Sequence, residues 1–197
     1  MQAHVRKVCQ TSYFHLRNIT SIRESLTQGA AEKLVHAFIS SRLDSCNSLL
    51  INIPSHLLSK LQRIQNAAAR AILRKSKRQA SSADLLQKLH WLPVKERIDF
   101  KVACLIFKCL NETAPLYLCE LVSPYIPSRN LRSQQSGLLC QPSVNLQTYG
   151  QRSFHFYAPS LWNSFPQHLR NAAFTSSYPV FKSLLKTHLF KTAFSLP

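Results

Sequence analysis

The chain has 197 residues, 45% of them hydrophobic, so it can bury the core of one compact domain, and its composition argues against wholesale disorder. Lys and Arg total 25 against 8 acidic residues, which gives a formal net charge of +17. Such an excess repels itself in a compact state unless anions lie against it, and nucleic acid is the commonest partner of this kind. An anionic membrane surface is the rival partner, but it favours basic residues gathered on an amphipathic helix, or a lipidation signal.

Neither a secretion signal nor a membrane span is predicted. No apolar segment follows the basic residues of Met1–Gln10, and the most apolar stretch, Val102–Phe107, is far too short to cross a bilayer. The six cysteines include no C-x-x-C pair, so we expect reduced, mostly buried thiols and neither a metal nor a cofactor. The expected location is intracellular, nuclear or cytoplasmic or both, and not secreted.

Apolar residues at three- and four-residue steps predict helices through the first 122 residues. The expected helices are His4–Glu24, with a break near Thr11–Ser12, then Ala30–Leu50, one from Pro54 or Ser55 to about Ile72, Ser82–Leu89, Pro93–Asn111 and Pro115–Val122. Pro54 and Pro93 suit a first helical turn, where a missing N–H would have no partner in any case. Residues 1–122 are therefore predicted to form a helical bundle.

The composition changes at Ser123, where Pro, Ser, Asn and Gln become frequent. We expect residues 123–147 to be a linker loop with a short strand at Gly137–Cys140, which pairs with a second strand over Arg152–Tyr157. Helices are expected at Ala158–Asn163, Pro166–Asn171 and Tyr178–Lys191. The predicted fold is therefore mainly α, a helical bundle followed by the linker and by a small mixed α/β C-terminal segment over residues 148–197.

The carboxylates give no sign of a catalytic centre. Two-metal catalysis needs two or three carboxylates close together, and the 8 acidic residues of this chain are scattered singly. Glu96 and Asp99 share a helical face, but the basic residues around them predict surface ion pairs. His90, beside Trp91, has no nucleophile partner and is expected to be a cap or a packed side chain. No catalytic residue is predicted.

Basic side chains form rows along two of the expected helices. The residues predicted to bind nucleic acid are Arg63, Asn66, Arg70 and Arg74 on one helix, Lys75, Lys77 and Arg78 in the loop after it, Arg97, Lys101 and Lys108 on the long helix, and Arg152 in the tail. The planar fork of arginine can bind two phosphate oxygens at once, and such contacts hold a backbone without reading its sequence. A solvated helix face is the alternative, as for most charge runs. The scarcity of acidic partners favours binding.

Several separate blocks of the chain carry a family resemblance. They are FHLRNI (Phe14–Ile19), AEKLVHAFISSRLDSCNSLL (Ala31–Leu50), LQRIQNAAARAI (Leu61–Ile72), LHWLPVKERIDFKV (Leu89–Val102), YGQRSFHFYAPSLWNSFPQHLRN (Tyr149–Asn171) and FKSLLKTHLF (Phe181–Phe190). In collinear order, these blocks resemble the region after the palm in jockey-like and related non-LTR (LINE-type) retrotransposon reverse transcriptases. The chain departs from the family pattern at Ser45, at the Asn52–Pro54 turn and over Ala80–Leu86.

The resemblance implies a thumb-like bundle that lies against a primer–template duplex, so the implied partner is RNA, DNA or an RNA–DNA hybrid. The family's catalytic aspartates lie in a palm upstream of the matched region, which makes the missing palm a second implied partner. The chain is therefore expected to be a nucleic-acid-binding fragment of an RNA-directed DNA polymerase, inactive alone. Trp91, Pro93 and Trp162 are expected to be packing anchors.

Two other hypotheses stay open. One is a polymerase-free helical protein-interaction module, derived from a retroelement, whose mark would be exposed apolar patches. The other is an enzyme whose catalytic half is encoded upstream of Met1, which the transcript sequence would reveal.

Overall fold

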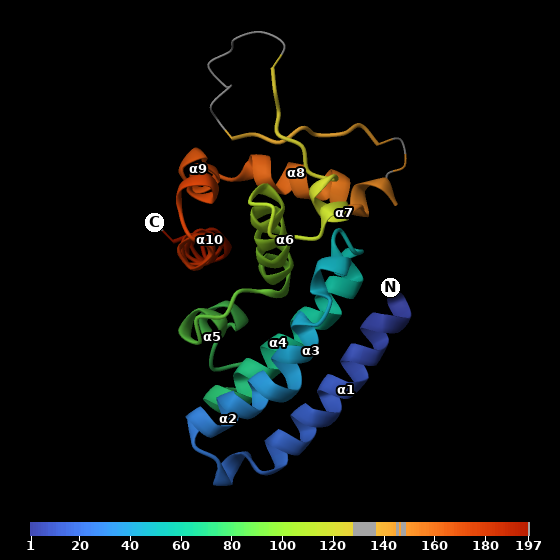
Figure 1. Ribbon diagram of the computed structural model, residues 1–197. Coiled ribbons are helices and arrows are strands. Elements are labelled where there is room, and N and C mark those ends of the chain that lie inside the picture. Colours follow the sequence, from blue (N-terminus) through green and yellow to red (C-terminus); the bar gives the residue numbers. More distant parts are fainter. Residues whose placement is uncertain (128–136, 145, 147–148, 197) are drawn as a thin grey trace. The chain divides into compact units, whose positions relative to one another are not determined.

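The computed structural model describes residues 1–127, 137–144, 146 and 149–196 (Figure 1). The fold is mainly helical, as predicted, and among the described residues the only β pairing is an isolated antiparallel bridge between Pro124 and Leu139. The chain divides into two compact units, one of Met1–Ile98 with Phe190–Pro197 and one of Asp99–Leu189. The first unit is therefore discontinuous in sequence.

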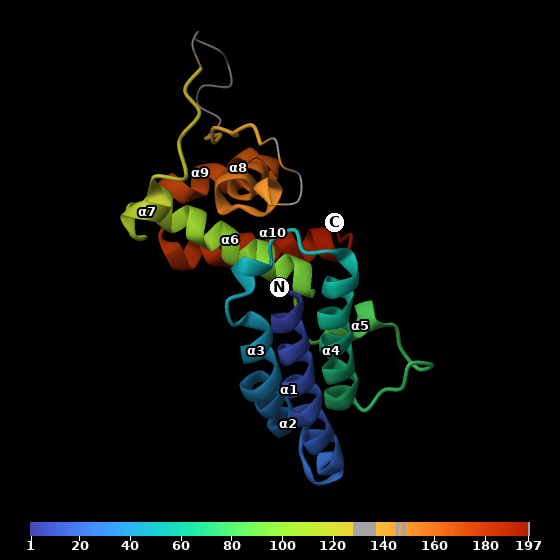
Figure 2. The same ribbon diagram turned by 90° about the vertical axis from the view of Figure 1, so that its right-hand side faces the viewer.

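The first unit is built from antiparallel helices. Its elements are α1 (Gln2–Ser21), η1 (Arg23–Ser25), α2 (Gln28–Val35), η2 (His36–Ser40), α3 (Ser41–Asp44), η3 (Asn47–Leu50), α4 (Ser55–Leu73), α5 (Ser82–Lys88) and the start of α6 (Val94–Leu110). The elements α2, η2 and α3 follow one another without a gap, and η2 is a π-helical turn. Helix α1 packs against α4 and against the α2–α3 helix, as Figures 1 and 2 show.

Helical periodicity explains why α1 and α4 pack together. The side chains that they bury are Val5, Ser12, Leu16 and Ile19 of α1, and Leu57, Leu61, Ile64, Gln65, Ala68, Ala69 and Ile72 of α4. Steps of three and four residues place each set on one helix face. Each large aliphatic side chain buried in this way stabilises the fold by about 1.5–3 kcal/mol. The break predicted near Thr11–Ser12 is wrong, since α1 runs through both residues and buries Ser12.

A buried arginine closes the C-terminal end of α4. Arg23 is only 7% exposed, and its Nε donates to the carbonyl of Ala71 (2.8 Å) and its Nη2 to that of Ile72 (2.6 Å). Its Nη1 donates to the carbonyl of Leu26 (2.7 Å). The last carbonyls of a helix have no partner within it, and a cation suits the negative end of the helix dipole. Arg23 thus ties the α1–α2 connection to the end of α4.

The segment between α5 and α6 is held by α4. Gln65 donates from Nε2 to the carbonyl of Leu92 (2.8 Å), and the N–H of Val94 donates to Oε1 of Gln62 (2.8 Å). Trp91 is 5% exposed. Its predicted role as a packing anchor is therefore confirmed.

The second unit surrounds an aromatic core. Its elements are the rest of α6, α7 (Leu116–Cys119), η5 (Gly150–Arg152), α8 (Phe154–Ser164), α9 (Gln167–Thr175) and α10 (Tyr178–Ala193) as far as Leu189. Trp162 and Phe181 are completely buried, and the ring of Phe107 stacks on that of Phe181 at 4.7 Å between centroids. Trp162 also donates from Nε1 to the carbonyl of Gly137 (2.9 Å). The indole is a packing anchor in this unit, as predicted.

The mixed α/β C-terminal segment is not found among the described residues. The predicted strand over Arg152–Tyr157 is wrong, because this stretch ends η5 and begins α8. Ser153 is the reason, since its Oγ accepts the N–H of Phe156 (3.3 Å) and caps a new helix. Leu139 of the other expected strand bridges to Pro124 instead. Of the predicted linker, residues 128–136, 145 and 147 lie outside the described residues, and so does residue 148 of the predicted C-terminal segment.

Candidate nucleic-acid interface

The predicted stripe Arg63, Asn66, Arg70 and Arg74 lies on α4 and at its C-terminal cap. Arg63 and Arg74 are exposed, whereas Asn66 and Arg70 are half-buried. Asn66 accepts a hydrogen bond on Oδ1 from Nε2 of Gln62 (2.8 Å), so its side-chain oxygen is bound to another residue of α4.

Two arginines of this stripe are fixed by neutral acceptors. Arg70 donates from Nη2 to Oγ of Ser82 (2.6 Å), and its buried Nε has no hydrogen-bond partner among the described residues. Arg74 donates from Nη2 to the backbone carbonyls of Arg23 (2.8 Å) and Glu24 (3.1 Å). No carboxylate neutralises either guanidinium through an ion pair in the described part of the chain. Both charges are therefore held in place and remain uncompensated.

Arg74 also takes an uncommon backbone conformation. Its φ of 51° is left-handed, and the N–H of Lys75 donates back to the carbonyl of Arg70 (3.2 Å). Glycine is the usual residue at this position of a helix end, because a side chain there costs about 1 kcal/mol. The chain therefore places a charged side chain where glycine would be more stable.

The loop after α4 carries the exposed cations Lys75, Lys77 and Arg78. Its turn is held by the N–H of Gln79, which donates to the carbonyl of Ser76 (3.2 Å), and by the N–H of Ser76, which donates to Oε1 of Gln79 (3.0 Å). Within the described residues, none of the three cationic side chains has a hydrogen bond or an ion pair. Their charges face solvent.

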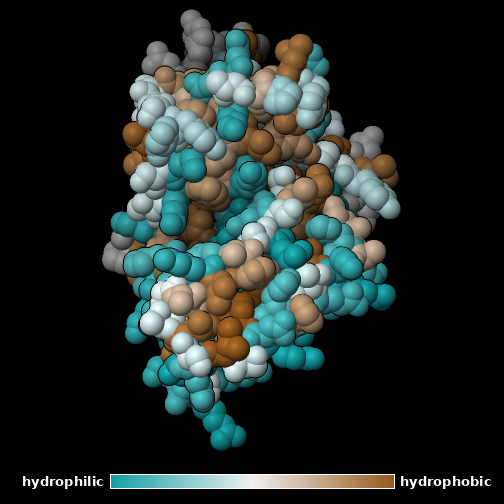
Figure 3. Space-filling model, turned by 60° about the horizontal axis from the view of Figure 1, so that its bottom comes forward, coloured by the Kyte–Doolittle hydropathy of each residue, from teal (hydrophilic) through white to brown (hydrophobic). Residues whose placement is uncertain are grey.

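A surface pocket brings Lys75 and Lys77 of this loop together with Arg23, Arg70 and Arg74, and Arg78 lies outside its lining. It has a volume of about 530 Å³ and lies between the C-terminal half of α1, α4 and the following loop. The lining residues are Leu16, Thr20, Arg23, Ala67, Arg70, Ala71, Arg74, Lys75, Ser76, Lys77 and Gln79. Five of these are cationic and none is acidic, so we name the site the basic pocket. In the lower part of Figure 3, which views the lower end of Figure 1, hydrophilic residues surround an apolar area.

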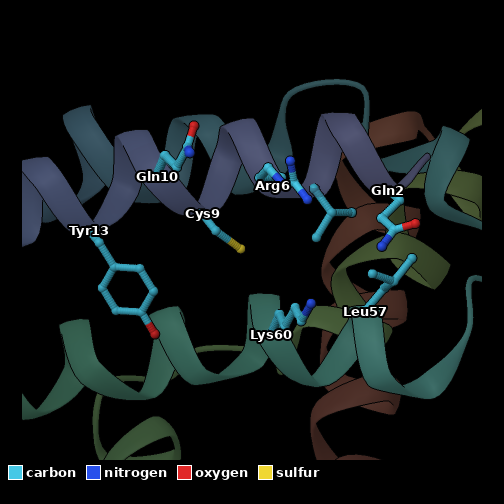
Figure 4. Close-up of a pocket in the computed structure, with 8 residues that line it drawn as sticks. Gln2, Arg6, Cys9, Gln10, Tyr13, Leu57 and Lys60 are labelled. Carbon is cyan, nitrogen blue, oxygen red and sulfur yellow. The ribbon is translucent and has the colours of Figure 1, made fainter.

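A second pocket, mainly apolar, lies between α1 and α4 nearer the start of α1 (Figure 4). This pocket has a volume of about 380 Å³, and Cys9 and Tyr13 of α1 point toward α4 across it. Burial raises the pKa of the Cys9 thiol above its usual 9.0, although the nearby Lys60 ammonium lowers it. Cys9 is therefore kept as a neutral thiol.

The second predicted row is not a uniform basic surface. Arg97 donates to both carboxylate oxygens of Asp44, from Nε to Oδ1 at 2.8 Å and from Nη2 to Oδ2, so its charge is balanced. The Lys108 ammonium lies 5.3 Å from the ring centroid of Tyr178 in a cation–π contact. Lys101 is exposed, and it is the member of this row that keeps a solvated, uncompensated charge in the described part of the chain.

Arg152 lies at the end of η5 in the second unit, where it is half-buried and interacts with other residues of the chain.

Asp99 corrects one expectation about the acidic residues. It does not lie at the surface, since it is 7% exposed, and its Oδ1 accepts a hydrogen bond from the Tyr157 hydroxyl (2.6 Å). Among the described residues, no group of three His, Cys, Asp or Glu side chains is placed to hold a metal ion.

Arg23 lines the basic pocket, and the sequence pattern does not identify it as a residue of this site. Its only local signal is a cation in a short connection between two helices, flanked by the apolar Ile22 and Leu26. Its partners Ala71 and Ile72 lie 48 and 49 residues away, so nothing in the local pattern identifies them.

No protein-family model, curated protein or solved structure matches this chain. None of the described helices combines the length and apolarity needed to cross a membrane.

Proposed function

We propose that this chain binds nucleic acid through the sugar–phosphate backbone, at the basic pocket and at the exposed loop cations beside it. The observation that carries the proposal is the gathering of five cationic side chains around one pocket that no carboxylate lines. The hydrogen bonds of Arg70 and Arg74 to neutral acceptors fix the guanidinium groups beforehand, which lowers the entropy lost when they meet phosphate. Contacts of this kind position a nucleic acid without reading its bases.

The family resemblance supports a finer form of the proposal. The chain would be the thumb-like, post-palm part of a LINE-type reverse transcriptase, with RNA, DNA or an RNA–DNA hybrid as its partner. The palm would supply the catalytic carboxylates, so this chain alone would bind and not polymerise.

The test compares two variants of equal charge. In the first, the exposed loop residues Lys75, Lys77 and Arg78 are changed together to Ala. In the control, three exposed lysines that do not line the basic pocket are changed together to Ala, namely Lys33, Lys88 and Lys95. Each variant lowers the net charge by three from the +17 of the chain, so a nonspecific effect of charge alone would be the same in both.

The measurement is fluorescence anisotropy with a labelled RNA–DNA hybrid, repeated over a range of salt concentrations. Each phosphate contact contributes about 0.9 to the slope of log affinity against log salt, so loss of three contacts flattens the slope by about 2–3. The loop variant should show this change, and the control should keep at least most of the original slope. Equal slopes for both variants would refute the basic pocket as the contact surface.

Exposed apolar side chains favour a protein-interaction module as the second candidate. Leu116, Tyr117 and Ile126 of the second unit are 74%, 66% and 82% exposed. Exposed apolar side chains are typical of docking sites where they form a contiguous patch. A folded chain that ignores the hybrid even at low salt would favour this candidate over nucleic-acid binding.

A further inference from the structure

Three aromatic rings lie together on a different face of α1 from the basic pocket. Phe14 of α1 is 60% exposed and Phe38 of η2 is 41% exposed. His15 lies between them, edge-on to Phe14 with centroids 5.4 Å apart and stacked on Phe38 with centroids 4.9 Å apart. We name these three residues the aromatic cluster. Two exposed phenylalanines that meet through a third ring form a surface on which another flat ring can stack.

A basic groove lies along the same two helices. It has a volume of about 470 Å³ and is lined by His4, Lys7, Val8 and Thr11 of α1 and by Ser41, Arg42 and Ser45 of α3 and its cap. Lys7 and Arg42 are exposed, and neither side chain has an ion pair or a hydrogen bond among the described residues. No acidic residue lines the groove, so it attracts anions.

Helical spacing makes the groove and the aromatic cluster one continuous surface. Residues 4, 7, 11 and 14 of α1 recur at steps of three and four, and so do residues 38, 42 and 45 of the facing helix. The two helices run antiparallel (Figures 1 and 2), which sets His15 against Phe38 and the start of α1 against α3. We name this surface the basic–aromatic seam.

The π-helical turn accounts for the position of Phe38. Within this turn the structure buries Ile39 and Ser40 and leaves Phe38 exposed beside His15. A π-helical turn carries an extra residue and shifts the side chains that follow, and such turns are frequent at functional sites.

We propose that the basic–aromatic seam binds a single nucleic-acid strand, with an unpaired base stacked on the aromatic cluster and backbone phosphates along Lys7 and Arg42. Proteins hold single strands by this combination of a cationic groove and aromatic rings. A duplex keeps its base faces covered, so it cannot use the rings in this way. The basic–aromatic seam lies on a different face of α1 from the basic pocket. It contacts the bases of the bound strand as well as its phosphates.

The test separates base stacking from phosphate binding. Two fluorescein-labelled strands of about ten nucleotides, within the usual site sizes, are titrated into the full chain: oligothymidylate and an abasic strand of the same length. The oligothymidylate should bind about fivefold or more tightly than the abasic strand, since a stacked base contributes at least that much. Equal affinity of the chain for the two strands would overturn the proposal, whether or not the duplex binds at the basic pocket.

Variants assign the effect to the seam. Phe14→Ala with Phe38→Ala should reduce the affinity for oligothymidylate to that for the abasic strand, and leave the abasic strand unaffected. Phe14→Tyr with Phe38→Tyr keeps both rings and should keep the preference. The matched control, Tyr13→Ala with Leu49→Ala, removes two exposed apolar side chains that do not line the seam, and it should also keep the preference. A loss in the control equal to that in the Phe14 and Phe38 variant would refute the assignment.

The phosphate half of the proposal has its own variant. Lys7→Ala with Arg42→Ala should weaken binding of both strands and flatten the salt dependence of single-strand binding by about 1.4, for two contacts at about 0.7 each. Far-ultraviolet circular dichroism checks that each variant keeps its helices. An unchanged salt dependence in this variant would exclude the groove as the path of the backbone.

Discussion

Replacing Arg23 by methionine removes three hydrogen bonds and keeps most of the apolar stem that Arg23 buries. The carbonyls of Ala71 and Ile72 at the end of α4, and that of Leu26, lose their charged donor. A hydrogen bond to a charged group contributes about 1.5–3 kcal/mol, and removal of the guanidinium also relieves the cost of burying its charge. The balance predicts a loss of about 2–4 kcal/mol in the free energy of unfolding of the first unit.

The two tryptophans allow the first unit to be followed alone. Trp91 lies in the first unit and Trp162 in the second, and both are buried. Urea unfolding followed by Trp91 fluorescence in a Trp162→Phe background therefore reports the unit that Arg23 closes. Arg17→Met, at an exposed position of the preceding helix α1, should change the free energy by no more than about 0.5 kcal/mol. A loss below about 1 kcal/mol for Arg23→Met would refute the capping role.

Two further predictions concern the titration of buried groups. Burial, and to a lesser degree the neighbouring His168, lowers the pKa of His188 from its usual 6.5. The unfolded chain then binds more protons than the folded one below pH 6.5, so the second unit should lose stability as the pH falls through that range and be unaffected by His188 above it. Burial and the adjacent Cys119 raise the pKa of Cys109 to about 11, so Cys109 of the folded chain should react with iodoacetamide at pH 8 far more slowly than the exposed Cys46, as followed by mass spectrometry.

Each of these predictions has a control. His188→Phe keeps an aromatic ring against Phe165, whose centroid lies 5.7 Å from that of His188, and it should flatten the acid side of the stability profile. The same acid loss in this variant and in the parent would exclude His188 as its cause. For the thiols, urea-unfolded chain should label Cys109 and Cys46 at similar rates. Fast labelling of Cys109 in the folded chain would contradict its burial.

The helices were predictable because their signal is local. Three- and four-residue apolar spacing places α4 and α10 almost where they lie, and Trp91 and Trp162 are recognised as buried from their Leu and Pro neighbours. The strand predicted over Arg152–Tyr157 fails because its aromatic residues suit a strand as well as a helix. The cap at Ser153 decides between them.

The interactions of the basic side chains were not predictable, because their partners are distant in sequence. Arg70 and Arg74 fall on one helix face, as the spacing requires, but their acceptors are 12 and about 50 residues away in sequence. Arg97 has the local pattern of an exposed cation, yet Asp44, 53 residues earlier, balances its charge. A pattern of charges thus predicts a basic face but does not identify which of its cations remain uncompensated.

The discontinuity of the first unit has a consequence for its synthesis. Its final segment begins at Phe190, whose ring lies 5.8 Å from that of His90 and 4.7 Å from that of Phe194. A ribosome makes the chain from its N-terminal side, so every residue of the second unit is joined before this segment exists. Of the two units, the one that begins to emerge first is therefore the last to be completed. Its helices can make their contacts with the segment from Phe190 onward only after the whole second unit has been synthesised.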